Sequence, residues 1–253
     1  MDELKAIIFD VDGTLAETER DGHRVAFNRA FSDVGLDWNW SNSLYGELLA
    51  VSGGKERLRY YLERDRPDFD PPGSLDDWIV AVHKRKNHYY QELLAAGAIP
   101  PRPGVKRLIQ EARDRGIRLA IATTSALPNA MAVLEQILDP SWFEVVAAGD
   151  VVPEKKPAPD IYHYALEQLQ LTARDCVAIE DSCQGLAAAR AAGLKPIITV
   201  NDYTRNQDFA GALLVLNHLG EPDRPFEVRW GAADGATYLD VDLLRRLHRA
   251  SVG

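Results

Sequence analysis

The chain has 253 residues, of which 46% are hydrophobic, and a formal net charge of −9. This length and composition predict a globular protein with a full core and a second, smaller domain. The negative charge, without a long run of Lys or Arg, argues against nucleic acid or an anionic membrane as a partner. No apolar stretch approaches the roughly 20 residues of a membrane span, and the N-terminus has no signal or transit pattern.

Cysteine occurs only at Cys176 and Cys183. We therefore expect no disulfide framework, a reducing cytoplasm as the location, and two small buried hydrophobic side chains at these positions.

The first predicted element is a buried strand over residues 4–9, which ends in Asp10-Val11-Asp12-Gly13-Thr14. In open parallel α/β sheets, ligands bind beyond the carboxyl ends of the strands, so Asp10 and Asp12 stand where chemistry is usually done. Gly13 lets the backbone curl tightly around a ligand or ion. An isolated acidic pair is more often a simple turn, so its interpretation depends on the later segments.

The region after this strand has helical periodicity and no comparable buried strand. Helices are expected at about 21–34, 55–65 and 75–96. The pattern predicts an α-helical cap domain over residues 17–102, inserted between two parts of an α/β core domain, 1–16 and 103–253. One linker is expected near 15–20, and the Pro-rich stretch 99–104 is the second, because proline restricts itself and its predecessor.

After about residue 100, β-branched runs alternate with longer helical patterns. This alternation predicts a doubly wound, mostly parallel, Rossmann-like α/β sheet in which the first strand is central. Residues 217–238 are predicted to form a surface loop before a last helix at 241–250. The other strands are expected at 117–122, 143–147, 176–179 and 195–199, and the helices between them at 128–138, 160–169 and 182–192.

Three segments add polar groups to the acidic pair. Thr123-Thr124-Ser125 ends a strand with hydroxyl groups that suit a phosphate. Lys156 precedes a helix opened by proline, although a solvated lysine is the alternative there. Glu180-Asp181 repeats the first pattern of a buried strand followed by two carboxylates. Oxygen ligands from two strand ends, without His or Cys, favour a hard cation such as Mg²⁺.

These motifs resemble, in order and spacing, those of the haloacid dehalogenase-like hydrolase superfamily. The insert is similar to the helical cap of the subgroup that holds β-phosphoglucomutase and the CbbY-like phosphatases. The stretches 52–58 and 84–87 look most like the CbbY-like branch, which is associated with sugar bisphosphates, notably xylulose 1,5-bisphosphate. The segment beyond about residue 217 is longer than that branch leads us to expect, and its role stays open.

The resemblance and the residue chemistry imply a Mg²⁺-dependent phosphoric monoester hydrolase. Asp10 would attack phosphorus to form an aspartyl-phosphate, and Asp12 would serve as the general acid and then as the base. Thr123 and Lys156 would stabilise the phosphoryl oxygens. The metal set is Asp10, Asp12, Glu180 and Asp181. A dehalogenase is disfavoured, because a departing halide needs no general acid.

The substrate is expected to be a small phosphorylated sugar bound by a monomer. Gly53-Gly54 beside Lys55 resembles an anion nest, although a glycine-rich turn with solvated charges fits equally well. His23 is as suited to bracing the linker as to touching substrate. The alternatives are a β-phosphoglucomutase-type mutase, which uses the same residues, and a non-catalytic phosphosugar-binding protein. The predicted substrate-binding residues are Glu17, His23, Gly53, Gly54, Lys55, Lys86, Asn87, Thr124, Ser125 and Asn129.

Overall fold

The computed structural model describes residues 3–51, 53–149 and 151–252. The chain divides into two compact units, of which the larger combines Met1–Glu17 with Pro100–Gly253 and the smaller is Thr18–Ile99. We describe each by itself. Ser52, in one of the stretches that carry the family resemblance, lies outside the described residues.

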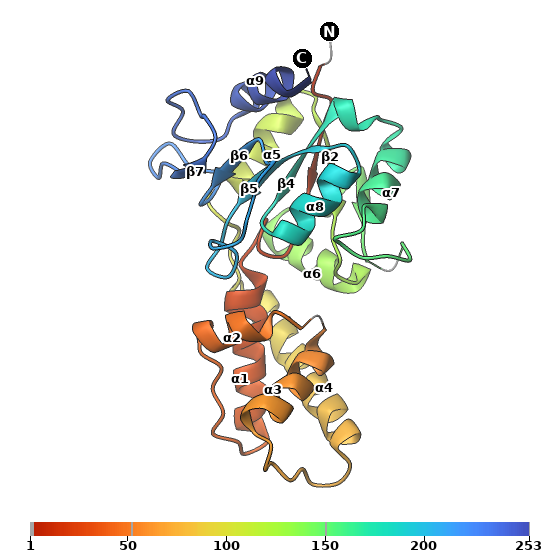
Figure 1. Cartoon of the computed structure of the whole chain (residues 1–253), viewed down its shortest axis with the longest axis vertical. Coiled ribbons are helices and arrows are strands. Elements are labelled where there is room, and N and C mark those ends of the chain that lie inside the picture. The colour runs from red at the N-terminus through yellow and green to blue at the C-terminus, as the bar shows by residue number, and fades with distance from the viewer. Residues whose placement is uncertain (1–2, 52, 150, 253) are drawn as a thin grey trace. The chain divides into compact units, whose positions relative to one another are not determined.

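The larger unit is built on a seven-stranded sheet in the described part of the chain, with strand order β3-β2-β1-β4-β5-β6-β7 (Figure 1). Strands β1 to β6 are parallel to their neighbours, and β7 pairs antiparallel with β6. The predicted doubly wound α/β class is confirmed, with β1 in the interior of the sheet. The strands are β1 Ala6–Phe9, β2 Arg118–Ala122, β3 Val145–Ala147, β4 Cys176–Glu180, β5 Lys195–Thr199, β6 Leu214–Leu216 and β7 Val228–Trp230.

Helices cover both faces of this sheet (Figure 1). Alternate residues of β1 point to opposite faces, and Ala6 and Ile8 pack with buried side chains of α7 and α8. Helix α9 packs against α5. The helices of this unit are α5 Val105–Asp114, α6 Leu127–Ile137, α7 Asp160–Leu169, α8 Cys183–Ala191 and α9 Val241–Val252, with short 3₁₀ turns at Pro140–Trp142 and Ala173–Asp175.

Strand β1 is a continuous apolar run because it is buried on both faces, as central parallel strands are. Its last residue, Phe9, lies in register with Ile121 of β2 and Ile179 of β4. The carboxyl ends of these three strands therefore meet at one edge. The residues just beyond the three strands are brought close together there.

In the described residues of the smaller unit, all regular secondary structure is helical. Helix α3 begins after Gly53, and side chains of Ser41 and Ser74 cap α2 and α4 by accepting main-chain hydrogen bonds at 3.1 Å. Its core is aromatic, with Trp40 packed against Phe27 and Phe31. Its elements are a π-helix at Thr18–His23, α1 Arg24–Asp33, α2 Asn42–Leu48, α3 Gly54–Asp65 and α4 Leu75–Ala95.

Several local expectations differ from the structure. The loop predicted over 217–238 contains β7, whose three residues are all exposed and so give no hydrophobic pattern. Helices α2 and α5 were not anticipated, and the expected first linker runs into the π-helix. Cys176 is buried, but Cys183 is exposed, so the prediction of a buried side chain is wrong for Cys183. Among the described residues, every helix is too short or too polar to cross a membrane.

Candidate active site

Three carboxylates gather at the edge where β1 and β4 end. Asp10 follows β1 directly, and its main-chain N–H donates to the carbonyl of Ile179 at 3.0 Å. Glu180 is the last residue of β4 and Asp181 follows it. Carboxylate oxygens of Asp10, Glu180 and Asp181 lie within 4.8 Å of one another, and all three residues are buried. The parallel register of β1 and β4 thus brings together residues 170 positions apart in the chain.

Lys156 supplies the positive charge of this cluster. Its Nζ lies 2.7 Å from Asp10 Oδ1 and 2.5 Å from Glu180 Oε1, and it donates to the carbonyl of Ala122 at 2.8 Å. Burial lowers the pKa of the ammonium, but the carboxylates of Asp10 and Glu180 outweigh burial, so the net pKa lies above its usual value. Lys156 is therefore a fixed cation at neutral pH.

One ammonium does not balance three carboxylates. Burial, followed by the charges of Asp10 and Glu180, raises the pKa of Asp181 well above its usual range. Burial also raises the pKa of Glu180, against the opposing effect of Lys156. Both shifts have one physical cause, which is negative charge confined away from water. The cluster can therefore hold a metal ion, whose charge would relieve the repulsion.

Glu180 has supports that sequence reasoning missed. The hydroxyl of Tyr162, on α7, donates to Glu180 Oε1 at 2.5 Å, and Tyr162 is fully buried. Gly185, in the first turn of α8, lies so close that a Cβ there would sit 1.9 Å from Glu180 Oε2. A side chain at this position would displace the carboxylate. The sequence could have indicated Tyr162, because its hydroxyl group lies among the apolar residues of the buried face of the helix at 160–169.

Asp12 and the hydroxyl residues after β2 form the second part of the site. Ser125 Oγ donates to Asp12 Oδ2 at 2.5 Å, and the main-chain N–H of Ser125 donates to Thr123 Oγ1 at 3.1 Å. Thr123 is buried and Asp12 is half-buried. Ser125, predicted to bind substrate, thus contacts the predicted acid and base. Of its predicted partners in substrate binding, Thr124 is half-buried and Asn129 lies exposed in the first turn of α6.

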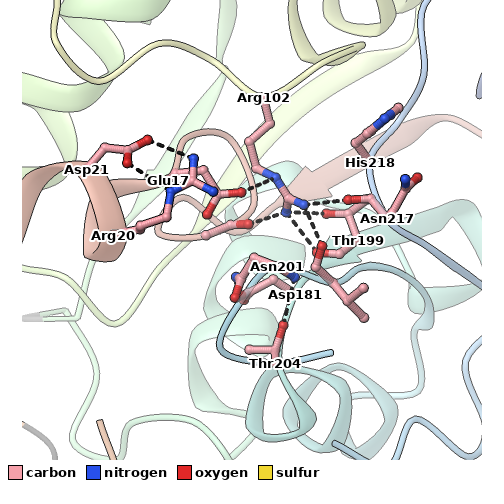
Figure 2. A network of polar contacts seen from close by, with 12 residues as sticks. Glu17, Arg20, Asp21, Arg102, Asp181, Thr199, Asn201, Thr204, Asn217 and His218 are labelled. Atoms are coloured by element: carbon pink, nitrogen blue, oxygen red, sulfur yellow. Dashed lines mark hydrogen bonds and ion pairs between the residues drawn. The ribbon is translucent and has the colours of Figure 1, made fainter. Parts of the chain in front are cut away.

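Asp181 is held by residues from a third strand end (Figure 2). Asn201, just beyond β5, donates from Nδ2 to Asp181 Oδ2 at 2.6 Å. The strand-end rule that points to Asp10 would also have found Asn201. Glu17, predicted to bind substrate, pairs through Oε1 with Nε of Arg102 at 2.9 Å. Arg102 has no local sequence signal, because its partners are distant in the chain.

In the smaller unit, His23 and Lys86 meet at one aromatic ring. His23 stacks on Tyr90 with ring centroids 4.1 Å apart. Lys86 is buried, and its Nζ lies 5.2 Å from the centroid of Tyr90 and 5.5 Å from that of Phe27. Burial, with the nearby ammonium of Lys86, lowers the pKa of His23 to about 3. His23 is therefore neutral at physiological pH, next to a buried cation.

The glycine pair and Lys55 lie near the same helix. A Cβ on Gly54 would sit 2.6 Å from Nε2 of His83, so α3 begins in close contact with α4. Burial lowers the pKa of His83 to about 4, and the ammonium groups of Lys86 and Lys55 add to that effect. Lys55, Gly53 and Asn87 are exposed, and Asn87 Oδ1 accepts from Lys86 Nζ at 3.3 Å.

A buried arginine in this unit was also missed. Arg57 Nη1 donates to the hydroxyl of Tyr45 at 2.8 Å and lies 3.6 Å from Glu19 Oε2. The Tyr45 hydroxyl donates to Glu19 Oε2 at 2.5 Å. Burial raises the pKa of Glu19, but His23 and Arg57 outweigh it, so the net pKa is lowered. Arg57 therefore pairs with the carboxylate of Glu19 in the part of this unit that also holds His23.

Comparisons with known proteins agree with this geometry. The model of the haloacid dehalogenase-like hydrolase family matches residues 4–193, which include every motif that carries the sequence resemblance. The plasmid protein CbbY of Cupriavidus necator is 46% identical over an alignment of 253 positions, which covers 98% of this chain and 98% of that protein. The crystal structure of CbbY from Rhodobacter sphaeroides in complex with phosphate is 46% identical, with a TM-score of 0.73 over 85% of this chain and 94% of that chain. A variant of that protein in complex with xylulose 1,5-bisphosphate is 45% identical, with a TM-score of 0.72 over the same shares.

Proposed function

The chain belongs to the haloacid dehalogenase-like hydrolase family, and within it to the CbbY-like branch, and from this membership and the site geometry we propose a Mg²⁺-dependent sugar phosphatase. The reaction proceeds through an aspartyl-phosphate on Asp10. The observation that carries the proposal is the buried group of Asp10, Lys156, Glu180 and Asp181, with Asp12 following Asp10 in the same loop. This group combines a nucleophile, a fixed cation and oxygen ligands for a metal.

The residues fit Mg²⁺ on chemical grounds. If all three carboxylates were ionised, they and Lys156 would leave an excess of two negative charges in a buried space, and the raised pKa values of Glu180 and Asp181 reflect that cost. A divalent cation with a preference for oxygen ligands matches both the charge and the donor atoms. Asp10, Asp181 and the main-chain carbonyl of Asp12 would hold it, with Glu180 beside them. When bound, the cation neutralises charge on the phosphoryl group as a Lewis acid.

Attack by Asp10 requires that repulsion between two anions be cancelled. Each pair of unit charges costs about 4 kcal/mol at about 4 Å and an effective dielectric constant of about 20. Lys156 offsets part of this repulsion, since its Nζ is already 2.7 Å from Asp10. The buried Thr123 provides a hydroxyl donor for a phosphoryl oxygen. Asp10 then forms a bond to phosphorus while the bond between phosphorus and the sugar oxygen breaks, and water hydrolyses the resulting acyl phosphate in the second step.

Asp12 acts as the acid in the first step and as the base in the second. It protonates the departing sugar alkoxide, and it then takes a proton from the attacking water. The hydrogen bond from Ser125 to Asp12 Oδ2 at 2.5 Å holds the carboxyl group in one orientation. A mutase would use the same two residues, so the geometry supports phosphoryl transfer by either route.

The substrate we propose is a ketose bisphosphate such as xylulose 1,5-bisphosphate. The similarity to the Rhodobacter sphaeroides variant in complex with that compound supports the choice. The cluster of Lys86, Lys55 and the buried Arg57 in the smaller unit supports it as well, because a second phosphate needs its own cations. We propose that this unit, Thr18–Ile99, is the cap that the sequence predicts over residues 17–102, and that it binds the distal part of the sugar.

A substrate panel tests the proposal. Purified protein with Mg²⁺ is assayed for phosphate release from sugar mono- and bisphosphates, and separately for interconversion of glucose 1-phosphate and glucose 6-phosphate. We expect phosphate release, with a preference for the ketose bisphosphate, and its loss in Asp10→Asn by several orders of magnitude. Interconversion without net phosphate release would instead identify a mutase. The absence of both reactions would leave a phosphosugar-binding protein.

A further inference from the structure

Arg102, a buried residue at the carboxyl edge of the sheet, makes several hydrogen bonds and is not among the predicted site residues. Arg102 is 6% exposed, and its Nε pairs with Glu17 Oε1 at 2.9 Å. Its two other nitrogens donate to main-chain carbonyls from three parts of the sheet edge, and the distances to the β5 and β6 loops are 2.6 to 2.8 Å. These carbonyls belong to Gly13, Thr199, Val200 and Asn217. Figure 2 labels Thr199 and Asn217 beside Arg102.

Only an arginine can make this set of contacts. A guanidinium has five N–H donors in a flat fork, so it can reach acceptors on several sides at once. A lysine has three donors on one nitrogen and cannot reach them together. The main chain of Arg102 is fixed as well, because its N–H donates to the carbonyl of Leu15 at 2.8 Å.

Two of the bound segments lie against Asp181. Gly13, in the loop after β1, has a φ of +83°, and a Cβ there would sit 2.4 Å from Asp181 Oδ2. On the other side, Val200 precedes Asn201, whose Nδ2 donates to Asp181 Oδ2 at 2.6 Å. The Asp181 carboxylate is thus confined between the Gly13 loop and the residue after β5. Arg102 binds the main chain of both.

The Asn201 side chain is itself held in one orientation. Its Oδ1 accepts from the main-chain N–H of Tyr203 at 2.9 Å, so its Nδ2 faces Asp181. The main-chain N–H of Asn201 donates to Thr204 Oγ1 at 3.0 Å. The turn after β5 therefore presents one amide donor to Asp181, and the position of that turn depends on the carbonyls that Arg102 binds.

We propose that Arg102 is a positioning residue for Asp181, acting through Gly13 and Asn201. It fixes the two segments that confine the Asp181 carboxylate and so sets the orientation in which that carboxylate meets the metal. The Arg102 side chain also pairs with Glu17, so it contacts the segment after β1 as well as the two segments that confine Asp181. The inference rests on the proposed Mg²⁺-dependent function. Residues that orient a metal ligand typically change metal affinity by about 10- to 100-fold when they are replaced.

The test compares Arg102→Lys and Asn201→Ala with a matched control, Arg107→Lys. Arg107 also pairs with a glutamate, at 3.2 Å from Glu221, and donates to the main-chain carbonyls of Gly220 and Leu239 at 2.9 and 3.0 Å. Among the described residues, the hydrogen bonds and ion pairs of Arg107 do not involve Asp181, Gly13 or Asn201. For each protein, the Kd for Mg²⁺ is measured by calorimetry without substrate, together with Tm and the Mg²⁺ dependence of kcat.

We expect Arg102→Lys and Asn201→Ala to raise the Kd for Mg²⁺ about tenfold or more. Part of the lost kcat should return at high Mg²⁺, and Arg107→Lys should leave the Kd unchanged. A lower Tm with an unchanged Kd in Arg102→Lys would overturn the proposal and give Arg102 a purely structural role. If Arg102→Lys does not fold, an unchanged Kd in Asn201→Ala overturns it.

Failure of this inference can be told apart from failure of the proposed function. If the parent protein binds Mg²⁺ and hydrolyses sugar phosphates while the Arg102 and Asn201 variants keep its Kd, only the positioning role is lost. If the parent protein itself binds no Mg²⁺ in calorimetry, the proposed function and the inference fall together.

Discussion

Replacing Tyr162 by phenylalanine removes one hydrogen bond from the carboxylate cluster and keeps the ring that packs below it. The Tyr162 hydroxyl is fully buried and donates to Glu180 Oε1 at 2.5 Å, where Lys156 Nζ also lies at 2.5 Å. The variant therefore tests how strongly the fold depends on a neutral donor beside an excess of negative charge.

The expected loss of stability is about 1.5–3 kcal/mol, which is the contribution of a hydrogen bond to a charged group. For a chain of this size, 1 kcal/mol corresponds to about 2–4 °C, so Tm should fall by roughly 3–12 °C. The loss should also depend on pH. The hydrogen bond from Tyr162 lowers the pKa of Glu180 and so opposes the effect of burial. Without it, the Glu180 carboxyl group stays protonated to higher pH in the folded variant. Because the folded state then binds more protons, its stability falls more steeply as pH rises.

The assay is thermal unfolding of metal-free protein at pH 5 and pH 8, with Tyr164→Phe as the control. Tyr164 lies on the same helix and is only partly buried. The deficit of Tyr162→Phe relative to the parent should be larger at pH 8 than at pH 5, and the control should differ little from the parent. A Tm shift below about 1 °C at both values of pH would refute the argument that this hydroxyl supports ionised Glu180.

The remaining predictions concern charge in both units. The pKa of His23 is lowered to about 3 in the folded protein, so between pH 6.5 and pH 5 the His23 side chain takes up a proton only in the unfolded protein. The free energy of unfolding should therefore fall from pH 6.5 to pH 5. In urea unfolding, His23→Phe should show a smaller decline over this range. EDTA should abolish activity and Mg²⁺ restore it, with Asp181→Ala needing much more Mg²⁺; restoration by Zn²⁺ alone would contradict the oxygen-ligand argument. Lys55→Ala and Lys86→Met should each lower kcat/KM for the bisphosphate about 10- to 100-fold, because each removes a hydrogen bond from a charged group to the substrate. Their activity on para-nitrophenyl phosphate should hardly change, and equal losses on both substrates would remove the distal-phosphate argument.

Much of the fold was predictable because the core strands are buried on both faces. Strand β1, and strand β4 up to the residue before Glu180, are continuous apolar runs. An apolar run that ends in carboxylates indicates both a buried strand and the edge of the sheet where that strand ends. Strand β7 was not predictable, because its three residues are exposed and its pairing with β6 depends on a chain reversal. Where packing against a neighbour decides the conformation, a single segment carries little information.

The candidate site divides in the same way. Asp10, Lys156 and the Glu180-Asp181 pair are identified from local patterns, and the structure brings their side chains together. Their roles in catalysis and metal binding stay predictions. Tyr162, Asn201 and Arg102 were missed, because each acts on a residue from another element. Nothing in the segment around Arg102 shows that its donors reach carbonyls 89 to 115 positions away.

The same register that assembles the site also makes it electrostatically unfavourable without a cation. Parallel pairing of β1 with β4 forces Asp10, Glu180 and Asp181 together, and burial removes the water that would screen them. Lys156, Tyr162 and Asn201 each satisfy one or two oxygens, yet the pKa of Asp181 stays well above its usual range. The fold therefore tolerates local repulsion that a bound proton or a metal ion would relieve. Carboxylate oxygens this close together could hold a metal ion, whose positive charge would relieve their repulsion.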